Sequence, residues 1–136
     1  STLGSGLSAS SYDLIIRCRP DLWFHSFEYP YVLHERRGVH RLTALTPWWG
    51  RFGGVNDRFA LLGCGAAEQY FTTYSRIAAL VAAGCPLHPE SLVAASIECF
   101  ACSSLQSEFS TLRPDGECRP PEISGIDLAH LALRSS

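Results

Sequence analysis

The sequence predicts a mixed α/β domain with few strands, and three observations point to this class. The stretch Tyr12–Cys18 is a nearly continuous apolar run rich in strand formers, as in a strand buried on both faces. The stretch Ala66–Ala83 repeats apolar residues every three or four positions, as in a helix with one buried face. Strand-like and helix-like stretches follow one another, and a doubly buried strand needs more neighbours than the chain provides. We therefore expect part of a larger sheet.

Composition describes a globular chain and excludes several functional classes. The 136 residues are 46% hydrophobic and 18% charged, which is enough for one domain with a real core. A formal net charge of −2 gives no electrostatic basis for binding nucleic acid or an anionic membrane. A membrane-spanning helix needs a run of about 18 or more apolar residues, and we find none.

The chain contains no lysine and no methionine, and it contains 6 cysteines. Lysine is absent, so all 11 basic residues are arginine, and the absence of methionine indicates a processed product or a piece of a longer protein. The 6 cysteines form no recognisable disulfide framework, and they leave the compartment unpredicted. Cys99-x-x-Cys102 has metal or redox spacing, but no second pair completes a zinc set. Core packing or an incidental disulfide is therefore favoured.

Turn and capping residues divide the chain into elements. Residues 1–11 are rich in serine and glycine and are predicted as a flexible lead-in, followed by a domain at 12–118 and a tail at 119–136. Gly84 and Pro86 end the long helix. The other predicted elements are an extended segment at 22–24, strands at 31–34 and 39–46 joined by a turn at 35–38, a strand at 59–62, a helix from Pro89 to about Ser103, a strand at 108–113 with a turn at 114–116, and a helix at 127–133 capped by Asp127.

The loop at 48–58 carries the densest group of side chains suited to binding. Its glycines allow positive φ or close approach to a ligand, and its polar residues offer an amide, a carboxylate and a guanidinium in succession. Its tryptophans could stack on the apolar face of a sugar. The alternative is an ordinary glycine-rich turn that leads into a strand. The candidate residues are Trp48, Trp49, Gly53, Gly54, Asn56, Asp57 and Arg58.

A second polar cluster follows the first predicted strand. Arg17 and Arg19 are suited to fork onto a diphosphate, and Asp21 is a candidate ligand for a divalent ion. Open α/β sheets bind ligands at the carboxyl ends of their strands, where this cluster is expected to meet the loop at 48–58. Glu90 is a further acid that could act as a general base, although a first-turn acid also stabilises a helix start.

Four phrases in this sequence occur in a familiar order and spacing. They are R-x-R-P-D at 17–21, G-G-V-N-D-R-F-A at 53–60, H-P-E-S-L at 88–92 and R-P-D-G at 113–116. Together they resemble the second half of the GT-A-type nucleotide-sugar glycosyltransferases found in bacterial polysaccharide-building proteins and large algal viruses. The resemblance implies a partial GT-A-like, Rossmann-like domain that lacks the N-terminal nucleotide-binding half. That half would then lie on another chain or on a longer precursor.

The resemblance also implies an activity and roles for individual residues. The activity is transfer of a sugar from a nucleotide-diphosphate donor to a glycan or other hydroxyl acceptor, with Mn²⁺ or Mg²⁺ as cofactor. Asp21 matches the last acid of the family's metal-binding motif, where the family has two acids, and Arg17 and Arg19 are its diphosphate-side neighbours. Asp57 is the preferred base and Glu90 the second choice. The residues expected to line the donor sugar and acceptor are Gly53, Gly54, Asn56 and Asp57.

Two other functions remain open on the sequence. The first is a non-catalytic, truncated transferase-like subunit that associates with other proteins in a larger assembly, and a single acid in the metal motif is compatible with it. The second is a carbohydrate-binding module that uses Trp48 and Trp49.

Overall fold

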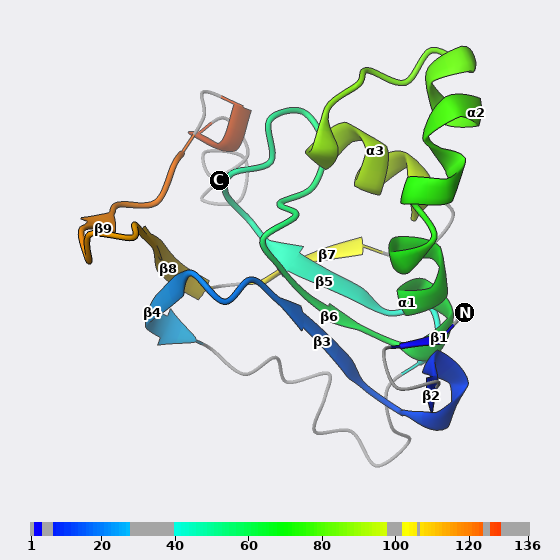
Figure 1. The fold of residues 1–136 in the computed structure, drawn as a ribbon, viewed down its shortest axis with the longest axis horizontal. Helices are drawn as coiled ribbons and strands as arrows, with labels where there is room; N and C mark the ends of the chain where they lie inside the picture. The colour runs from blue at the N-terminus through cyan, green and yellow to red at the C-terminus, as the bar shows by residue number, and fades with distance from the viewer. Residues whose placement is uncertain are drawn as a thin grey trace.

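The computed structural model describes residues 2–3, 7–27, 40–97, 102–105, 107–123 and 126–128, and it has a mixed α/β fold. A four-stranded sheet lies at the centre, with helices over one face and a three-stranded sheet toward the other (Figure 1). The predicted mixed α/β class is therefore confirmed. No helix in the described part of the chain is long and apolar enough to cross a membrane.

The central sheet combines antiparallel and parallel pairs. Its strands are β3 (Ile15–Cys18), β6 (Phe59–Leu62), β5 (Ala44–Pro47) and β7 (Cys102–Leu105), in that order across the sheet. The first two junctions, β3 with β6 and β6 with β5, are antiparallel, whereas β5 pairs with β7 in parallel. The strand predicted at 59–62 is confirmed at both ends, and Pro47 closes β5 as expected.

The first strand is not buried on both faces, and this prediction is wrong. Ile15 is buried, but its neighbour Ile16 is 58% exposed. Within the described residues β3 lies at the edge of the sheet and pairs only with β6. The helices cover one face of β3 and its other face is open, so the apolar run marked an edge strand.

A second sheet packs beside the first. It contains β4 (Leu22–Phe27), β8 (Ser107–Leu112) and β9 (Cys118–Arg119), all antiparallel. The strand predicted at 108–113 is confirmed as β8, and the turn after it has a positive φ at Gly116. The extended segment predicted at 22–24 is the first half of β4.

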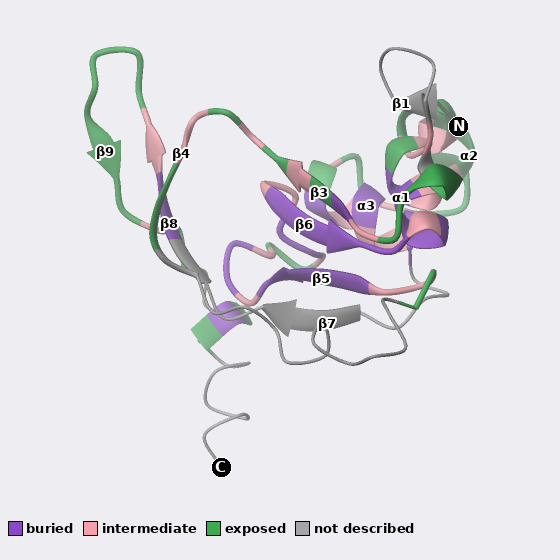
Figure 2. Cartoon of the chain, turned by 90° about the horizontal axis from the view of Figure 1, so that it is seen from below, coloured by how far each residue is buried: buried purple, intermediate pink, exposed green. Residues whose placement is uncertain are grey.

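Two apolar cores lie on opposite faces of the central sheet, and Figure 2 shows buried residues concentrated in β5 and β6. The core on the helical side contains Ile15, Ala44, Val55, Ala60, Leu62, Ala66, Ala67, Tyr70, Val93 and Ile97. The core toward the second sheet contains Leu45, Trp49, Phe59, Leu61 and Phe109. The alternation of side chains along β6 places successive residues in different cores.

The long helix predicted at 66–83 is interrupted. The structure has α1 (Cys64–Phe71), a 3-10 turn at Tyr74–Arg76 and α2 (Ile77–Ala82). The hydroxyl of Thr72 donates to Glu68 O at 2.7 Å and that of Thr73 to Tyr70 O at 2.8 Å. Threonine hydroxyls that bond to the backbone compete with the helix, which accounts for the break. The predicted buried face does not continue past the break, since α2 has no buried residue.

The helix cap at Gly84 and the helix start at Pro89 are both as predicted, but the second helix ends earlier than predicted. Gly84 has φ +99° and donates its amide to Val81 O, while Cys85 donates to Leu80 O, as in a Schellman C-cap. The helix α3 (Pro89–Ser96) begins at the predicted proline. It does not reach the predicted Ser103, because residues 102–105 form β7 instead. Parallel pairing with β5 has overridden the local helical pattern there.

The remaining predictions fall partly outside the described residues. In the described part of the strand predicted at 39–46, only residues 44–46 belong to a strand, β5. The strand predicted at 31–34 and the turn at 35–38 lie outside the described residues. Residues 126–128 are helical, and the rest of the predicted terminal helix also lies outside them. Cys99 falls outside as well. Cys18, Cys64, Cys85 and Cys118 are free thiols.

The lead-in predicted at 1–11 contains short regular elements in its described part. The strands β1 (Thr2–Leu3) and β2 (Leu7–Ser8) pair with each other, and a 3-10 turn at Ala9–Ser11 follows. This turn lies against α1, so the start of the chain adjoins the helical layer (Figure 1).

Candidate functional site

Antiparallel pairing of β3 and β6 brings the two predicted polar clusters together. Cys18 pairs with Phe59, so the end of β3 lies beside the residues that precede β6. The amide of Arg19 donates to Arg58 O at 3.2 Å. The two clusters were expected to meet at the carboxyl ends of strands, but here the carboxyl end of β3 meets the amino end of β6.

The guanidinium of Arg19 donates hydrogen bonds to both carboxylate oxygens of Asp21. Its Nε donates to Oδ1 at 2.9 Å and its Nη2 donates to Oδ2. These hydrogen bonds lower the pKa of Asp21 and raise the pKa of Arg19. Both oxygens of Asp21 therefore already have a cationic partner.

The described residues do not fit the divalent ion that the resemblance implies. No group of three His, Cys, Asp or Glu side chains in the described part of the chain is arranged to hold a metal ion. A Mg²⁺ or Mn²⁺ site uses one or two carboxylates, and the one candidate, Asp21, is bound to an arginine. The assignment of Asp21 as a metal ligand stays a prediction.

Asn56 holds the loop at 48–58 together from inside. Its side chain is fully buried, its Nδ2 donates to Trp49 O at 2.7 Å, and its Oδ1 accepts from the amide of Arg58 at 2.9 Å. Trp49 is 2% exposed and packs on Phe109, with 4.5 Å between ring centroids. Trp48 packs partly buried against the same core. In this structure Asn56 and Trp49 support the loop, and the Trp49 ring is closed to a sugar.

Gly53 and Gly54 fit their positions in the loop for different structural reasons. A Cβ built on Gly54 would lie 2.1 Å from Glu90 O, so the loop backbone rests directly on the start of α3. The next amide, Val55 N, donates to the same oxygen at 3.2 Å. Gly53 has φ +84° and no neighbour within 4 Å of an added Cβ. Only Gly53 lies open on the surface, and Phe52 beside it also has a positive φ, of +47°.

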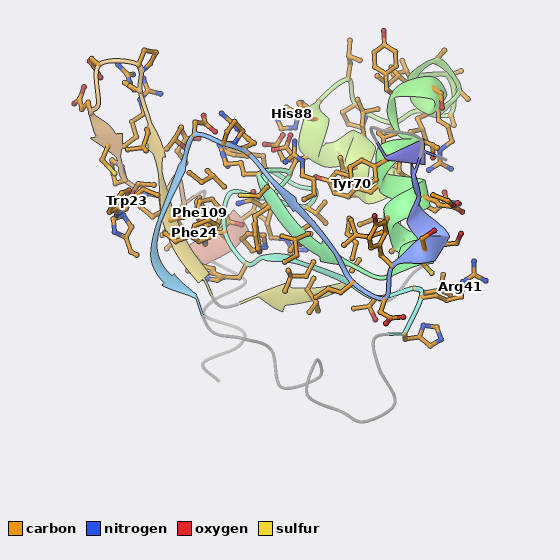
Figure 3. All side chains as sticks on the ribbon, turned by 60° about the horizontal axis from the view of Figure 1, so that its bottom comes forward. Trp23, Phe24, Arg41, Tyr70, His88 and Phe109 are labelled. Carbon is orange, nitrogen blue, oxygen red and sulfur yellow. The ribbon has the colours of Figure 1, made fainter. Side chains whose placement is uncertain are left out.

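The His88-Pro89-Glu90 phrase forms the other side of this loop. The Glu90 carboxylate is buried, and its Oε2 lies 3.0 Å from Nδ1 of His88. The His88 ring lies at the start of α3 (Figure 3), and its centroid is 6.0 Å from that of Phe52. The contact with His88 lacks hydrogen-bond geometry and is an ion pair only when His88 is protonated. Because the Glu90 carboxylate is enclosed at the first turn of α3, its arrangement corresponds more closely to a structural first-turn acid than to an exposed base.

Tyr70 joins the predicted residues, although its spacing marked it only as a core residue. Its hydroxyl donates to Asp57 O at 3.1 Å, and the guanidinium carbon of Arg17 lies 5.8 Å from its ring centroid. Burial raises the pKa of Tyr70 to about 12; the charge of Arg17 opposes this shift, while those of Asp57 and Glu90 add to it. Figure 3 shows Tyr70 between α1 and the central sheet. Three predicted residues thus surround one buried phenol.

The carboxylate of Asp57 has no hydrogen-bond or ion-pair partner among the described residues. Asp57 is half-buried, and its charge contributes to the raised pKa of both Arg19 and Tyr70. Arg17 has a comparable feature, since its buried Nη1 has no hydrogen-bond partner within the described part of the molecule. The buried Nη1 of Arg58 also has no hydrogen-bond partner there, so three predicted side chains keep unused hydrogen-bonding capacity among the described residues.

Two acids of the C-terminal tail bond to the loop, and neither was predicted as a site residue. Glu122 Oε2 accepts from Arg58 Nη2 at 2.9 Å. Asp127 is fully buried, and its Oδ2 accepts from the amides of Gly50 at 2.7 Å and Arg51 at 3.4 Å. The sequence predicted Asp127 as a helix cap, and it gave no indication of this bond to the loop. The local sequence cannot predict a contact between residues that lie so far apart in the chain.

A pocket of about 360 Å³ lies elsewhere, between the end of α2 and α3. Its lining contains no candidate site residue and consists of Leu80, Ala83, Gly84, Cys85 and Ala95. The polar chemistry gathers at the loop, so we place the candidate site there.

Comparison of the chain with protein-family models, curated proteins and solved structures found no match.

Replacing Gly54 by alanine should destabilise the fold by about 3 kcal/mol, because the added Cβ would overlap a backbone oxygen. The matched variant Gly53→Ala meets no atom and should lose only about 1 kcal/mol, through its left-handed conformation. Urea unfolding of both variants measures the difference. Equal losses would contradict the close contact between the loop and α3.

Tyr70 should ionise near pH 12, well after an ordinary tyrosine at about 10. Because the pKa of Tyr70 is higher in the folded chain than in the unfolded chain, its contribution to the free energy of unfolding is fully present below about pH 10. This contribution is lost as the pH rises from about 10 to 12. Spectrophotometric titration of tyrosinate in the native protein and in Tyr70→Phe should show a late step in the native chain only. Identical titration curves would refute the buried phenol.

Proposed function

We propose that the chain forms the sugar-facing part of a GT-A-like glycosyltransferase, which transfers a sugar from a nucleotide-diphosphate donor to a hydroxyl acceptor. One observation carries this proposal: three of the phrases shared with such enzymes converge on one loop. Arg19-Pro20-Asp21, Asn56-Asp57-Arg58 and His88-Pro89-Glu90 are far apart in sequence, yet backbone bonds link the first and third directly to the loop. A merely local turn would not require such distant partners.

Asp57 is the best candidate for the general base. Its carboxylate has no partner among the described residues, whereas that of Asp21 is bound to Arg19 and that of Glu90 is buried against His88. In the proposed step the acceptor hydroxyl gives its proton to Asp57 while its oxygen bonds to the anomeric carbon of the donor. The bond from that carbon to the diphosphate oxygen breaks, and the electron pair leaves with the diphosphate. The hydrogen bond from Tyr70 to Asp57 O would hold the base in place.

The two arginines of the first cluster differ in their capacity to bind a phosphate oxygen. Arg17 has a buried Nη1 without a hydrogen-bond partner in the described residues, so its guanidinium could donate to a phosphate oxygen at little further desolvation cost. Arg19 is less suited to this role, because Asp21 already occupies its Nε and Nη2.

A non-catalytic role in a larger assembly is the second candidate, and specific contacts favour it. Asn56, Gly54 and Trp49, which match or adjoin the phrases of the family, serve the internal packing of the loop. The acid of the metal motif is tied to Arg19. A domain retained for its shape would keep these contacts without turnover.

Titration calorimetry with UDP- and GDP-sugars, with and without Mn²⁺, separates the two candidates. The transferase proposal expects the native chain to bind the donor through its sugar- and diphosphate-facing residues, without the contacts that the nucleotide-binding half would add. With an acceptor present, it also expects Asp57→Asn to lower turnover by about a hundredfold or more. Asp13→Asn, which changes an exposed acid outside the site, is the matched control and should keep turnover. Absence of donor binding by a folded native chain, together with stoichiometric recovery in a complex, would favour the assembly role.

A further inference from the structure

We infer that the loop at 48–58 contains an anion site, and that carboxylates from the chain's own tail occupy it. The two tail carboxylates are Glu122 and Asp127. The ligand class is a phosphate or diphosphate, which must displace them to bind.

The backbone at Gly50 and Arg51 forms the first part of this site. Both amides donate to one oxygen, Oδ2 of Asp127, at 2.7 and 3.4 Å. Gly50 has φ +64°, and a left-handed residue directs consecutive N–H groups toward a single point. Such a concave pair of amides binds anions irrespective of their chemical identity, and a carboxylate holds the position here.

Arg58 forms the second part and lies directly against the first. A Cβ added to Gly50 would be 2.7 Å from Nη1 of Arg58, so the guanidinium touches the backbone that supplies the amides. Nη2 donates to Glu122, but Nη1 is buried and has no hydrogen-bond partner among the described residues. The planar fork of arginine matches two phosphate oxygens, whereas the present contact uses one of its Nη groups.

The tail carboxylates satisfy this site only in part. A buried carboxylate is tolerated when backbone amides donate to it, as they do to Asp127. Glu122 is half-exposed, and an exposed ion pair contributes little to stability, so this contact is easily exchanged. A diphosphate brings more charge and more oxygens, including one for the unpaired Nη1. The tail therefore competes with an anionic ligand from within the molecule.

This competition would regulate access to the proposed transferase site. The inference rests on the proposed function for the identity of the anion, which would be the diphosphate of the donor. The anion site itself depends only on the amides of Gly50 and Arg51 and on Arg58. It can be tested without any sugar nucleotide.

Calorimetric titration of inorganic pyrophosphate into the full chain, in metal-free buffer, is the test. The variants are Glu122→Gln, the double variant Glu122→Gln/Asp127→Asn, and Glu117→Gln as a matched control. Glu117 is an exposed acid on the hairpin of β8 and β9, so its substitution changes the charge equally without touching the loop. Circular dichroism verifies that each variant is folded.

If the tail occupies the site about nine-tenths of the time, its release should tighten pyrophosphate binding about tenfold. Glu122→Gln should show part of this gain and the double variant all of it. Adding Arg58→Gln to Glu122→Gln should abolish it. No gain in folded Glu122→Gln, or an equal gain in Glu117→Gln, would overturn the inference, and Glu122→Gln decides if the double variant unfolds. Pyrophosphate binding without sugar transfer would instead refute the proposed function alone.

Discussion

The buried side chain of Asn56 is the interaction on which the loop at 48–58 depends. Its amide spans the loop from Trp49 O to the amide of Arg58, and it has no contact with water. A buried side-chain amide left unpaired costs about 1–3 kcal/mol, so both contacts must form together. Trp49 in turn anchors one end of the loop in the core, and Arg58 leads into β6 at the other. The candidate site is therefore built on a rigid, internally bonded loop.

The loop acquires its neighbours from three directions. The antiparallel pairing of β3 with β6 brings Arg19 and Asp21, the close approach at Gly54 brings Glu90, and the tail brings Asp127. None of these partners is local in sequence. Arginines and acids both lie around the loop, and the chain's net charge of −2 therefore gives no indication of an anion site.

Much of this architecture could be predicted, and the failures have physical causes. Local rules identified β6, β8, the start of α3 and the cap at Gly84, because short apolar runs mark buried strands and because proline and glycine act on their own neighbours. They failed where long-range pairing decided the outcome, as when residues 102–105 joined β5 rather than α3. They also failed where side chains bonded to the local backbone, as at Thr72.

The candidate site, too, could be predicted only in part. The phrases predicted which residues gather around the loop, but residue type did not reveal which would be buried supports. Asn56 and Trp49 are enclosed, whereas Asp57 keeps an unpartnered carboxylate within the described residues. Tyr70 and Asp127 were invisible as site residues, because one followed a core spacing and the other a capping pattern. Contacts of this kind arise from tertiary structure alone.

Native-state hydrogen exchange of the loop amides tests the central claim, that Asn56 makes the loop one cooperative unit. In Asn56→Ala the amides of Gly50, Val55 and Arg58 should lose protection together, with a common opening free energy, although only Arg58 bonds to the substituted side chain. Loss of protection at Arg58 alone, with Gly50 and Val55 unchanged, would contradict it.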